Sequence, residues 1–204
     1  MSKILHINSS VRSTGSISRQ LSSEFLNRWQ ATHPSDVISE LDLASNPVPH
    51  LSEQMMGAFF TPAEQRTAEQ AQTVAISDKL VAQLLEADII VIGAPMYNFS
   101  ISSGLKAWID HIARVGMTFK YTETGPVGLV SGKKVYVFTS RGGVYSEGPA
   151  KAMDFHETYL RAVLGFIGIT DIQFIHTEGV AMGEEATAKA LLASRNTISD
   201  LLAA

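Results

Sequence analysis

The chain has 204 residues, of which 45% are hydrophobic and 18% charged, a composition that suits one globular domain with a sizeable core. Its formal net charge of −4 comes from 16 basic and 20 acidic residues without a basic stripe, so we expect no nucleic-acid partner. The absence of cysteine excludes disulfides, thiolate nucleophiles and Cys-ligated metal centres, so any redox chemistry requires a bound cofactor.

The N-terminus has no targeting pattern. Residues 1–8 are too few, and the chain is too polar after Ile7, for a signal peptide. No apolar run approaches the length that spans a bilayer. We therefore expect a cytoplasmic protein without a membrane partner.

The first predicted unit is a strand, a hydroxyl-rich loop and a helix. Ile4–Ile7 predicts a short strand, and the loop Asn8–Arg19 that follows is rich in serine. The helix after the loop carries Leu21, Phe25 and Trp29 at helical spacing on one face.

The next region predicts an edge strand and a long helix. Val37–Leu43 alternates partly, as a marginal edge strand does, and Ala44–Phe60 favours irregular structure with room for one short helix. Thr61–Glu64 has the pattern of a helix start, with threonine as N-cap, proline at the first helical position and glutamate at the capping-box position. The apolar stripe of this helix is Ala71, Val74, Val81, Leu84 and Leu85.

An apolar, β-branched run without alternation predicts the central strand. This run, Ile89–Ile92, is typical of a strand buried on both faces of a parallel sheet. After a loop at Pro95, a helix follows with Leu105, Ile109 and Ile112 on its buried face. Ligands of open α/β sheets bind outside the carboxyl ends of the strands, so we expect the loop at Pro95 to line a ligand site.

The C-terminal half adds two strands. Phe119–Leu129 is too long for a minimal connection and has the length of a functional lid. Val135–Thr139 predicts the fourth strand and Ile172–His176 the fifth, with helical patterns over 155–167 and 191–202. The whole chain therefore predicts one α/β domain with a doubly wound, five-stranded parallel sheet and helices on both faces.

Several nucleotide, hydrolase and metal motifs are absent or incomplete. No G-x-G-x-x-G run follows the first strand, and Gly128–Lys134 departs from the Walker spacing. Ser146 lacks the preceding glycine of a nucleophile elbow, and the six histidines show no metal-ligand spacing. We therefore expect neither a serine hydrolase nor a metal site.

The hydroxyl-rich loop suits a phosphate. Backbone N–H groups at a helix start attract anions, and the hydroxyls of Ser10, Ser16 and Ser18 add donors. An ordinary capped helix explains this loop equally well when it is considered alone. The loops Met96–Phe99 and Gly142–Gly143 reach the same sheet edge and add a flat apolar slot. Together the three loops suit flavin mononucleotide (FMN).

Arg141 allows two interpretations. Its guanidinium could lie near the flavin ring, or its backbone alone could contact the ring while the side chain is solvated. We favour the backbone role.

Four motifs follow one another along the chain: Ser10 with Ser16-Ile17-Ser18, Pro95-Met96-Tyr97-Asn98-Phe99, Gly125-Pro126-Val127-Gly128-Leu129 and Ser140-Arg141-Gly142-Gly143. In this order they resemble the FMN-dependent NADH azoreductases, which are also NAD(P)H:quinone oxidoreductases. The resemblance implies a flavodoxin-like fold with strand order 2-1-3-4-5, tightly bound FMN, and a homodimer with its active site at or near the subunit interface. The implied FMN contacts are Ser10, Ser16, Ile17, Ser18, Met96, Tyr97, Asn98, Phe99, Ser140, Arg141, Gly142 and Gly143. The residues that resemble the family's substrate pocket are Phe59, Phe60, Phe119 and Tyr121.

The resemblance also implies hydride transfer by exchange of two substrates at one site. NADH, or NADPH, delivers a hydride to the flavin, and a quinone or aromatic azo compound then takes its place and is reduced. Backbone N–H groups of Gly142 and Gly143 would stabilise the negative charge that reduction places on the flavin. Water can supply the protons, so we expect no catalytic side chain.

Two other functions remain open on the sequence alone. A flavodoxin-type carrier would pass single electrons to a protein partner, but flavodoxins are typically more acidic and lack an excursion like Phe119–Leu129. A flavin-free regulatory domain could share the fold, and the three loop motifs together disfavour it.

Overall fold

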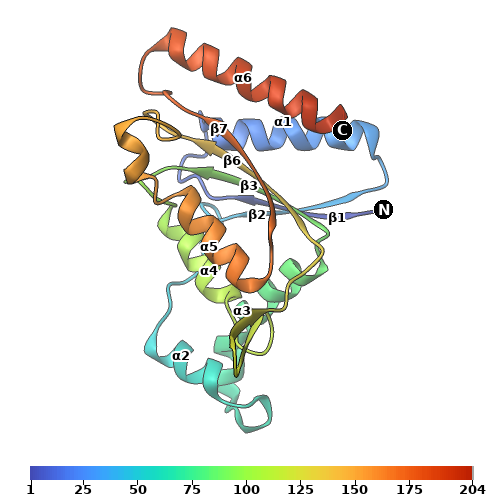
Figure 1. The fold of residues 1–204 in the computed structure, drawn as a ribbon. Helices are drawn as coiled ribbons and strands as arrows, with labels where there is room; N and C mark the ends of the chain where they lie inside the picture. The colour runs from blue at the N-terminus through green and yellow to red at the C-terminus, as the bar shows by residue number, and fades with distance from the viewer. Residues whose placement is uncertain (204) are drawn as a thin grey trace.

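A five-stranded parallel sheet forms the centre of the protein, which a computed structural model describes over residues 1–203. Its strands lie in the order β2-β1-β3-β6-β7 (Figure 1). They are β1 (Lys3–Asn8), β2 (Val37–Asp42), β3 (Ile89–Pro95), β6 (Lys134–Ser140) and β7 (Asp171–Thr177). Within this sheet the order is the predicted 2-1-3-4-5, with β2 at the edge and β3 in the centre.

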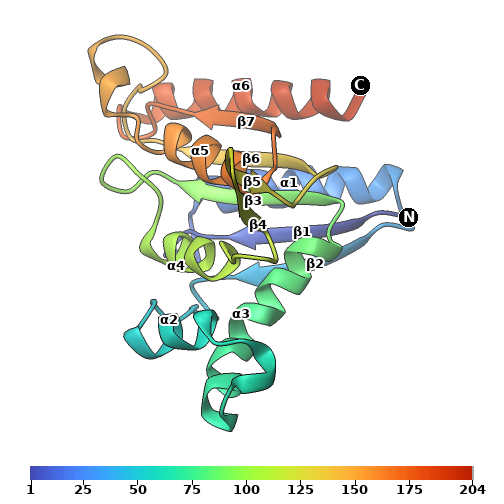
Figure 2. The same cartoon turned by 60° about the horizontal axis from the view of Figure 1, so that its bottom comes forward.

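Helices cover both faces of the sheet, as predicted (Figures 1 and 2). One face carries α1 (Ile17–Thr32) and α6 (Glu184–Ala203), and the other carries α3 (Ala68–Glu86), α4 (Ser103–Ile112) and α5 (Glu157–Ile167). The shorter helical segments are α2 (Glu53–Phe60), η1 (Ala63–Gln65) and η2 (Pro149–Met153). No helix within residues 1–203 is both long and apolar enough to cross a membrane.

Successive side chains of the central strand enter two separate cores. Ile90 and Ile92 pack in the core beneath α3, α4 and α5, whereas Val91 packs with Phe25 of α1 on the opposite face. All three strand residues are buried, so an apolar side chain is favoured at every position. This explains the uninterrupted apolar run in the sequence.

The long helix α3 begins later than the sequence predicted. Its N-cap is Thr67, whose hydroxyl accepts a hydrogen bond from the backbone N–H of Gln70 while the Gln70 side chain accepts from Thr67 N–H. The predicted cap, Thr61, instead ends α2, and its hydroxyl donates to the carbonyl of Gly57. Two neighbouring start signals were present, and the reciprocal capping box formed at the second.

The predicted lid is a two-stranded hairpin. β4 (Phe119–Thr122) pairs antiparallel with β5 (Gly125–Gly128), and α2 projects from the sheet near the same end of the molecule (Figures 1 and 2). The hairpin contacts the end of α5, where a Cβ atom at Gly128 would overlap the backbone of Gly168. The hairpin is therefore held against the body of the fold.

Candidate functional site

A cavity of about 160 Å³ lies where the carboxyl ends of the sheet strands meet. Seven of the twelve predicted cofactor residues line it: Ser10, Ser16, Ile17, Met96, Tyr97, Ser140 and Gly142. The other lining residues, which are not among those twelve, are Arg12, Gly15, Pro95 and Val180. The structure thus brings together loops that follow β1, β3, β6 and β7.

The start of α1 forms one end of this cavity. Ser16 is the N-cap, and the backbone N–H groups of Ile17 and Ser18 have no acceptor within the described chain. Ser10 is buried with its hydroxyl 3.3 Å from the Tyr97 hydroxyl, and Ser18 is buried with its hydroxyl 3.3 Å from that of Ser16. Free N–H groups, hydroxyls and a helix N-terminus together suit a phosphate.

An ion pair anchors this loop to the edge strand. The Arg19 guanidinium contacts both carboxylate oxygens of Asp42, at 2.8 and 3.1 Å, and donates to the carbonyl of Ser10 at 3.3 Å. The hydrogen bond from Arg19 outweighs desolvation and lowers the pKa of Asp42 to about 2. Asp42 is therefore charged at neutral pH, and the pair fixes the position of Ser10.

The loop after β3 is a tight turn with unusual backbone angles. Tyr97 and Ser100 exchange two backbone hydrogen bonds of 2.9 and 3.0 Å around Asn98 and Phe99. Both central residues have positive φ, 48° and 69°, as a type I′ turn requires. Asn98 and Phe99 do not line the cavity; Asn98 lines a second hollow, of about 670 Å³, that also includes Tyr97. Strained non-glycine residues of this kind are concentrated at functional sites.

The first three residues of the loop after β6 have their carbonyls engaged on one side of the loop, which leaves backbone N–H donors on the other. The carbonyls of Arg141, Gly142 and Gly143 accept hydrogen bonds from the N–H groups of Val180, Ala181 and Gly179, respectively, at 3.0–3.1 Å. In a trans peptide the N–H points opposite to the C=O. The N–H groups of Gly142, Gly143 and Val144 therefore point away from residues 179–181. They have no acceptor among residues 1–203.

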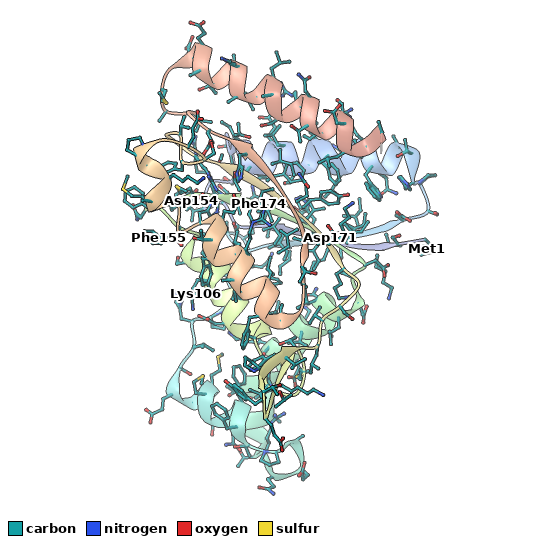
Figure 3. The ribbon with its side chains drawn as sticks, viewed as in Figure 1. Met1, Lys106, Asp154, Phe155, Asp171 and Phe174 are labelled. Carbon is teal, nitrogen blue, oxygen red and sulfur yellow. The ribbon has the colours of Figure 1, made fainter. Side chains whose placement is uncertain are left out.

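The side chain of Arg141 is not solvated, which corrects that part of the favoured interpretation. The side chain is 0% exposed rather than solvated, and its Nη1 lies 2.9 Å from Asp154 and 3.1 Å from Glu178. Asp154 comes just before the first turn of α5 (Figure 3). The backbone N–H of Arg141 donates to Thr177, and its carbonyl accepts from Val180. Carboxylates distant in the sequence compensate the buried charge, so Arg141 supports the loop from behind.

The segment after β7 was not predicted to belong to the site. Glu178 and Gly179–Ala181 bind the backbone of the loop after β6, and Val180 lines the cavity. The available signal was their position, since they directly follow the fifth parallel strand and so lie at the same sheet edge. Their own side chains carry no recognisable motif.

His156 lies in the charged cluster around Arg141. Both of its ring nitrogens are buried without a hydrogen-bond partner in the described chain. Burial and the neighbouring Arg141 charge lower the pKa of His156 to about 3, so the ring is neutral. Residues 1–203 contain no group of three His, Cys, Asp or Glu side chains arranged to hold a metal ion.

The four aromatic residues predicted to shape a substrate pocket do gather around one hollow. Phe59 and Phe60 from α2 and Phe119 and Tyr121 from β4 line a space of about 280 Å³. The Arg114 guanidinium lies 4.1 Å from the Phe59 ring centroid and fixes this wall. The hollow shares no lining residue with the cavity at the sheet edge.

Comparisons with known proteins agree with this architecture. A family model described as a flavodoxin-like fold matches residues 2–202. The FMN-dependent NADH:quinone oxidoreductase of Herminiimonas arsenicoxydans is 64% identical over 204 residues, 100% of both chains. The structure of an azoreductase from Bacillus anthracis strain Sterne has a TM-score of 0.92 at 34% identity and covers 99% of each chain. An FMN-dependent NADH-azoreductase from B. anthracis strain Ames Ancestor, solved in complex with FMN, has a TM-score of 0.88 at 29% identity, covering 99% of this chain and 100% of that one.

Proposed function

Because the chain belongs to the flavodoxin-like fold family, whose model covers residues 2–202, we propose that it is an FMN-dependent oxidoreductase. It uses NADH to reduce quinones and to cleave aromatic azo compounds to amines. The observation that carries the proposal is the cavity at the sheet edge, where free backbone donors of two loops surround a space lined by hydroxyl and aromatic side chains. The names of the relatives favour this function over a one-electron carrier.

The cavity offers hydrogen-bond donors for the phosphate of FMN and for its ring system. The phosphate would be held by Ser10, Ser16 and the free N–H groups of Ile17 and Ser18. Bound FMN would supply hydride transfer between NADH and the second substrate, once for a quinone and twice for the cleavage of an azo bond to two amines. The remaining residues of the proposed site, Met96–Phe99 and Ser140–Gly143, would hold the ring system.

The protein contributes position and electrostatics rather than an acid or base. The N–H groups of Gly142 and Gly143 are oriented before any ligand binds, because Val180 and Ala181 hold the carbonyls of the same two peptide groups, those of Arg141 and Gly142. Preorganised donors of this kind stabilise negative charge without reorganisation. We assign no side chain as a proton donor, and water supplies protons to the product.

The proposal includes a homodimer with the active site at or near the subunit interface. Phe60 is 72% exposed and Tyr121 69%, although both are large apolar or aromatic side chains. Phe155, which is 60% exposed, adds a third exposed ring beside η2 (Figure 3). Since the aromatic hollow and the cavity share no residue in one chain, pairing of two chains offers a way to bring them together. Exposed apolar groups of this size favour an interface.

We propose further that residues 1–204 form a single FMN-binding domain and that the protein lies in the cytoplasm. NADH, the proposed donor, is available there. Cell fractionation with detection of the protein would test the location, and a membrane fraction carrying the protein would contradict it.

A spectroscopic experiment tests the function. The purified protein should show the two visible absorption bands of a flavin, and anaerobic NADH should bleach them until a quinone or azo dye is added. A flavin that NADH does not reduce would instead support the electron carrier, and failure to bind added FMN would refute the cofactor assignment. Sedimentation or light scattering of the same sample should give the mass of a dimer.

Replacement of Gly142 tests the site. A Gly142→Val side chain would enter the cavity or displace Ala181, whose Cβ lies 3.4 Å from the position of a new Cβ. FMN retention should fall. Gly57→Ala, where a Cβ meets no atom within 4 Å, is the matched control and should retain FMN as the wild type does. Equal flavin content and turnover in Gly142→Val and wild type would contradict the assignment.

A further inference from the structure

The carboxylate of Glu178 lies behind the glycine loop and binds its backbone. Its Oε1 accepts hydrogen bonds from the N–H groups of Tyr145 and Ser146, at 2.8 and 3.1 Å. Its Oε2 accepts from the Ser146 hydroxyl at 2.5 Å. One side chain from the end of β7 therefore fastens the far end of a loop that begins at the end of β6.

The same carboxylate fastens the near end of the loop through a buried cation. Oε1 of Glu178 also accepts from Nη1 of Arg141, at 3.1 Å, and Arg141 is fully buried. Burial alone would raise the pKa of Glu178, but the bonds from Ser146, Tyr145 and Arg141 outweigh it and lower the pKa. Glu178 is thus held charged with both oxygens engaged.

Between these two attachments lie the glycines with free donors. Gly142 and Gly143 have no side chain that could restrict their backbone, and glycine is the residue with the most freedom to lose. The carbonyls of Arg141 and Gly142, which share peptide groups with the N–H of Gly142 and of Gly143, are held by Val180 and Ala181 in the segment that follows Glu178. The orientation of the two N–H groups therefore depends on where Glu178 holds this segment against the loop.

Resting on the proposed function, we propose that Glu178 is a positioning residue for the flavin. By clamping Arg141 at one end of the loop and Tyr145–Ser146 at the other, it aims the N–H groups of Gly142 and Gly143 at the pyrimidine edge of the ring. Reduction places negative charge on that edge, so donors fixed in advance favour the reduced form. Nothing in this role requires Glu178 itself to touch FMN.

The test compares three variants of the full chain. Glu178→Ala removes the clamp, and Glu178→Gln keeps an oxygen that can accept from Tyr145 and Ser146 but loses the charge that faces Arg141. Glu157→Gln is the matched control, because Glu157 belongs to the same charged cluster, 3.9 Å from Arg141, and has no hydrogen bond to the loop 142–146. It removes the same charge and leaves the clamp intact.

Three measurements are made on each protein. Amide hydrogen exchange of the peptide containing residues 141–146 is measured on the protein freed of FMN. FMN affinity comes from titration of the apo-protein followed by flavin fluorescence, and the midpoint potential of the bound flavin comes from anaerobic redox titration. The exchange measurement needs no flavin and reports on the loop alone.

We expect the exchange rate of the loop and the dissociation constant of FMN to rise in the order wild type, Glu178→Gln, Glu178→Ala. The FMN dissociation constant of Glu178→Ala should rise about tenfold or more, because hydrogen bonds to a charged acceptor are lost. The midpoint potential should become more negative in the same order. Glu157→Gln should match the wild type in all three.

Two results would overturn the proposal. Unchanged exchange of residues 141–146 in Glu178→Ala would show that Glu178 does not hold the loop. Equal weakening of FMN binding in Glu157→Gln and Glu178→Ala would assign the effect to the charge of the cluster. If the wild type bound no FMN, the proposed function would fall and the positioning role with it, whereas the exchange data would still report whether the clamp exists.

Discussion

The ring of Phe99 packs edge-on against the ring of Tyr145, with their centroids 6.2 Å apart. This contact joins the turn after β3 to the loop after β6, the two segments proposed to hold the flavin ring. Phe99 makes it from a backbone conformation with φ of 69°, which a bulky L-residue rarely adopts. The backbone conformation of Phe99 therefore lowers the stability of the turn, but it places the Phe99 ring against Tyr145.

Two substitutions at Phe99 separate strain from contact. Phe99→Gly and Phe99→Ala both remove the ring, but only glycine adopts positive φ freely. We expect Phe99→Gly to be more stable than Phe99→Ala by about 0.5–1 kcal/mol in urea unfolding of the apo-proteins. Both variants should bind FMN more weakly than the wild type. Equal stability of the two variants would show that the turn is not strained.

His156 should make stability depend on pH in the mildly acidic range. Its pKa is lowered from 6.5 to about 3, first by burial and then by Arg141, so the folded protein does not bind a proton that the unfolded chain binds below pH 6.5. This contribution to stability is complete above pH 6.5 and is lost as the pH falls toward 3. Within this range, His156 lowers the free energy of unfolding by about 1.4 kcal/mol for each unit that the pH falls.

The variant His156→Leu isolates this slope. Neither ring nitrogen of His156 has a hydrogen-bond partner, so an apolar side chain of similar size breaks no bond. Denaturant unfolding at several pH values between 7.5 and 4.5 should give curves of stability that diverge below pH 6.5, with the wild type falling more steeply. Parallel curves would contradict a neutral buried His156.

The sheet and two of the loops proposed to bind the cofactor could be predicted from the sequence because each carries a local signal. The run Ile89–Ile92 is apolar at every position because both of its faces are buried. The loop with Ser10 and Ser16 carries hydroxyls next to a helix start. Such features depend on neighbours along the chain, and a parallel sheet then brings the loops to one edge.

The parts that sequence reasoning missed depend on contacts between distant segments. The sequence around Arg141 predicts a solvated cation, because nothing local indicates that Asp154 and Glu178 lie beside its guanidinium. Residues 179–181 act through backbone atoms, which every residue has, so no pattern of side chains reveals them. The shift of the helix start from Thr61 to Thr67 has the same origin. The hydroxyl of Thr61, the predicted N-cap, donates to the carbonyl of Gly57 at the end of α2 instead.

The Arg19–Asp42 pair should stabilise the protein at neutral pH. The pKa of Asp42 is lowered from 3.8 to about 2, chiefly by the hydrogen bond from Arg19, so its contribution is present above pH 4 and is lost as the pH falls to 2. Asp42→Asn should lower the free energy of unfolding at pH 7 by about 2 kcal/mol. The difference from the wild type should shrink below pH 4. Asp200→Asn on the exposed side of α6 is the charge-matched control.

Asp42→Asn also has a consequence for the cofactor, because Arg19 donates to the carbonyl of Ser10. With its partner neutral, Arg19 should hold Ser10 less firmly, and FMN affinity should fall while Asp200→Asn keeps it. Unfolding and flavin titration on the same preparations give both results. Wild-type stability of Asp42→Asn at pH 7 would contradict the role of the pair.

Two glycines near the end of α5 should respond to alanine in opposite directions. A Cβ at Gly128 of the hairpin would overlap the backbone of Gly168, which ends α5 with φ of 107°. Backbone on both sides leaves no flexible group to give way, so Gly128→Ala should destabilise the protein by about 1–3 kcal/mol. Gly165 lies inside α5 with no atom within 4 Å of its Cβ position, so Gly165→Ala should stabilise by about 0.5–1 kcal/mol.

The same pair tests whether the hairpin depends on this contact. The ring centroids of Phe119 in β4 and Phe166 in α5 lie 4.5 Å apart. Displacement of the hairpin in Gly128→Ala should therefore also separate these rings. Amide exchange over residues 119–128 should then rise in Gly128→Ala and stay unchanged in Gly165→Ala. If exchange in the hairpin were the same in both variants, its position would be set by contacts other than the approach of Gly128 to Gly168.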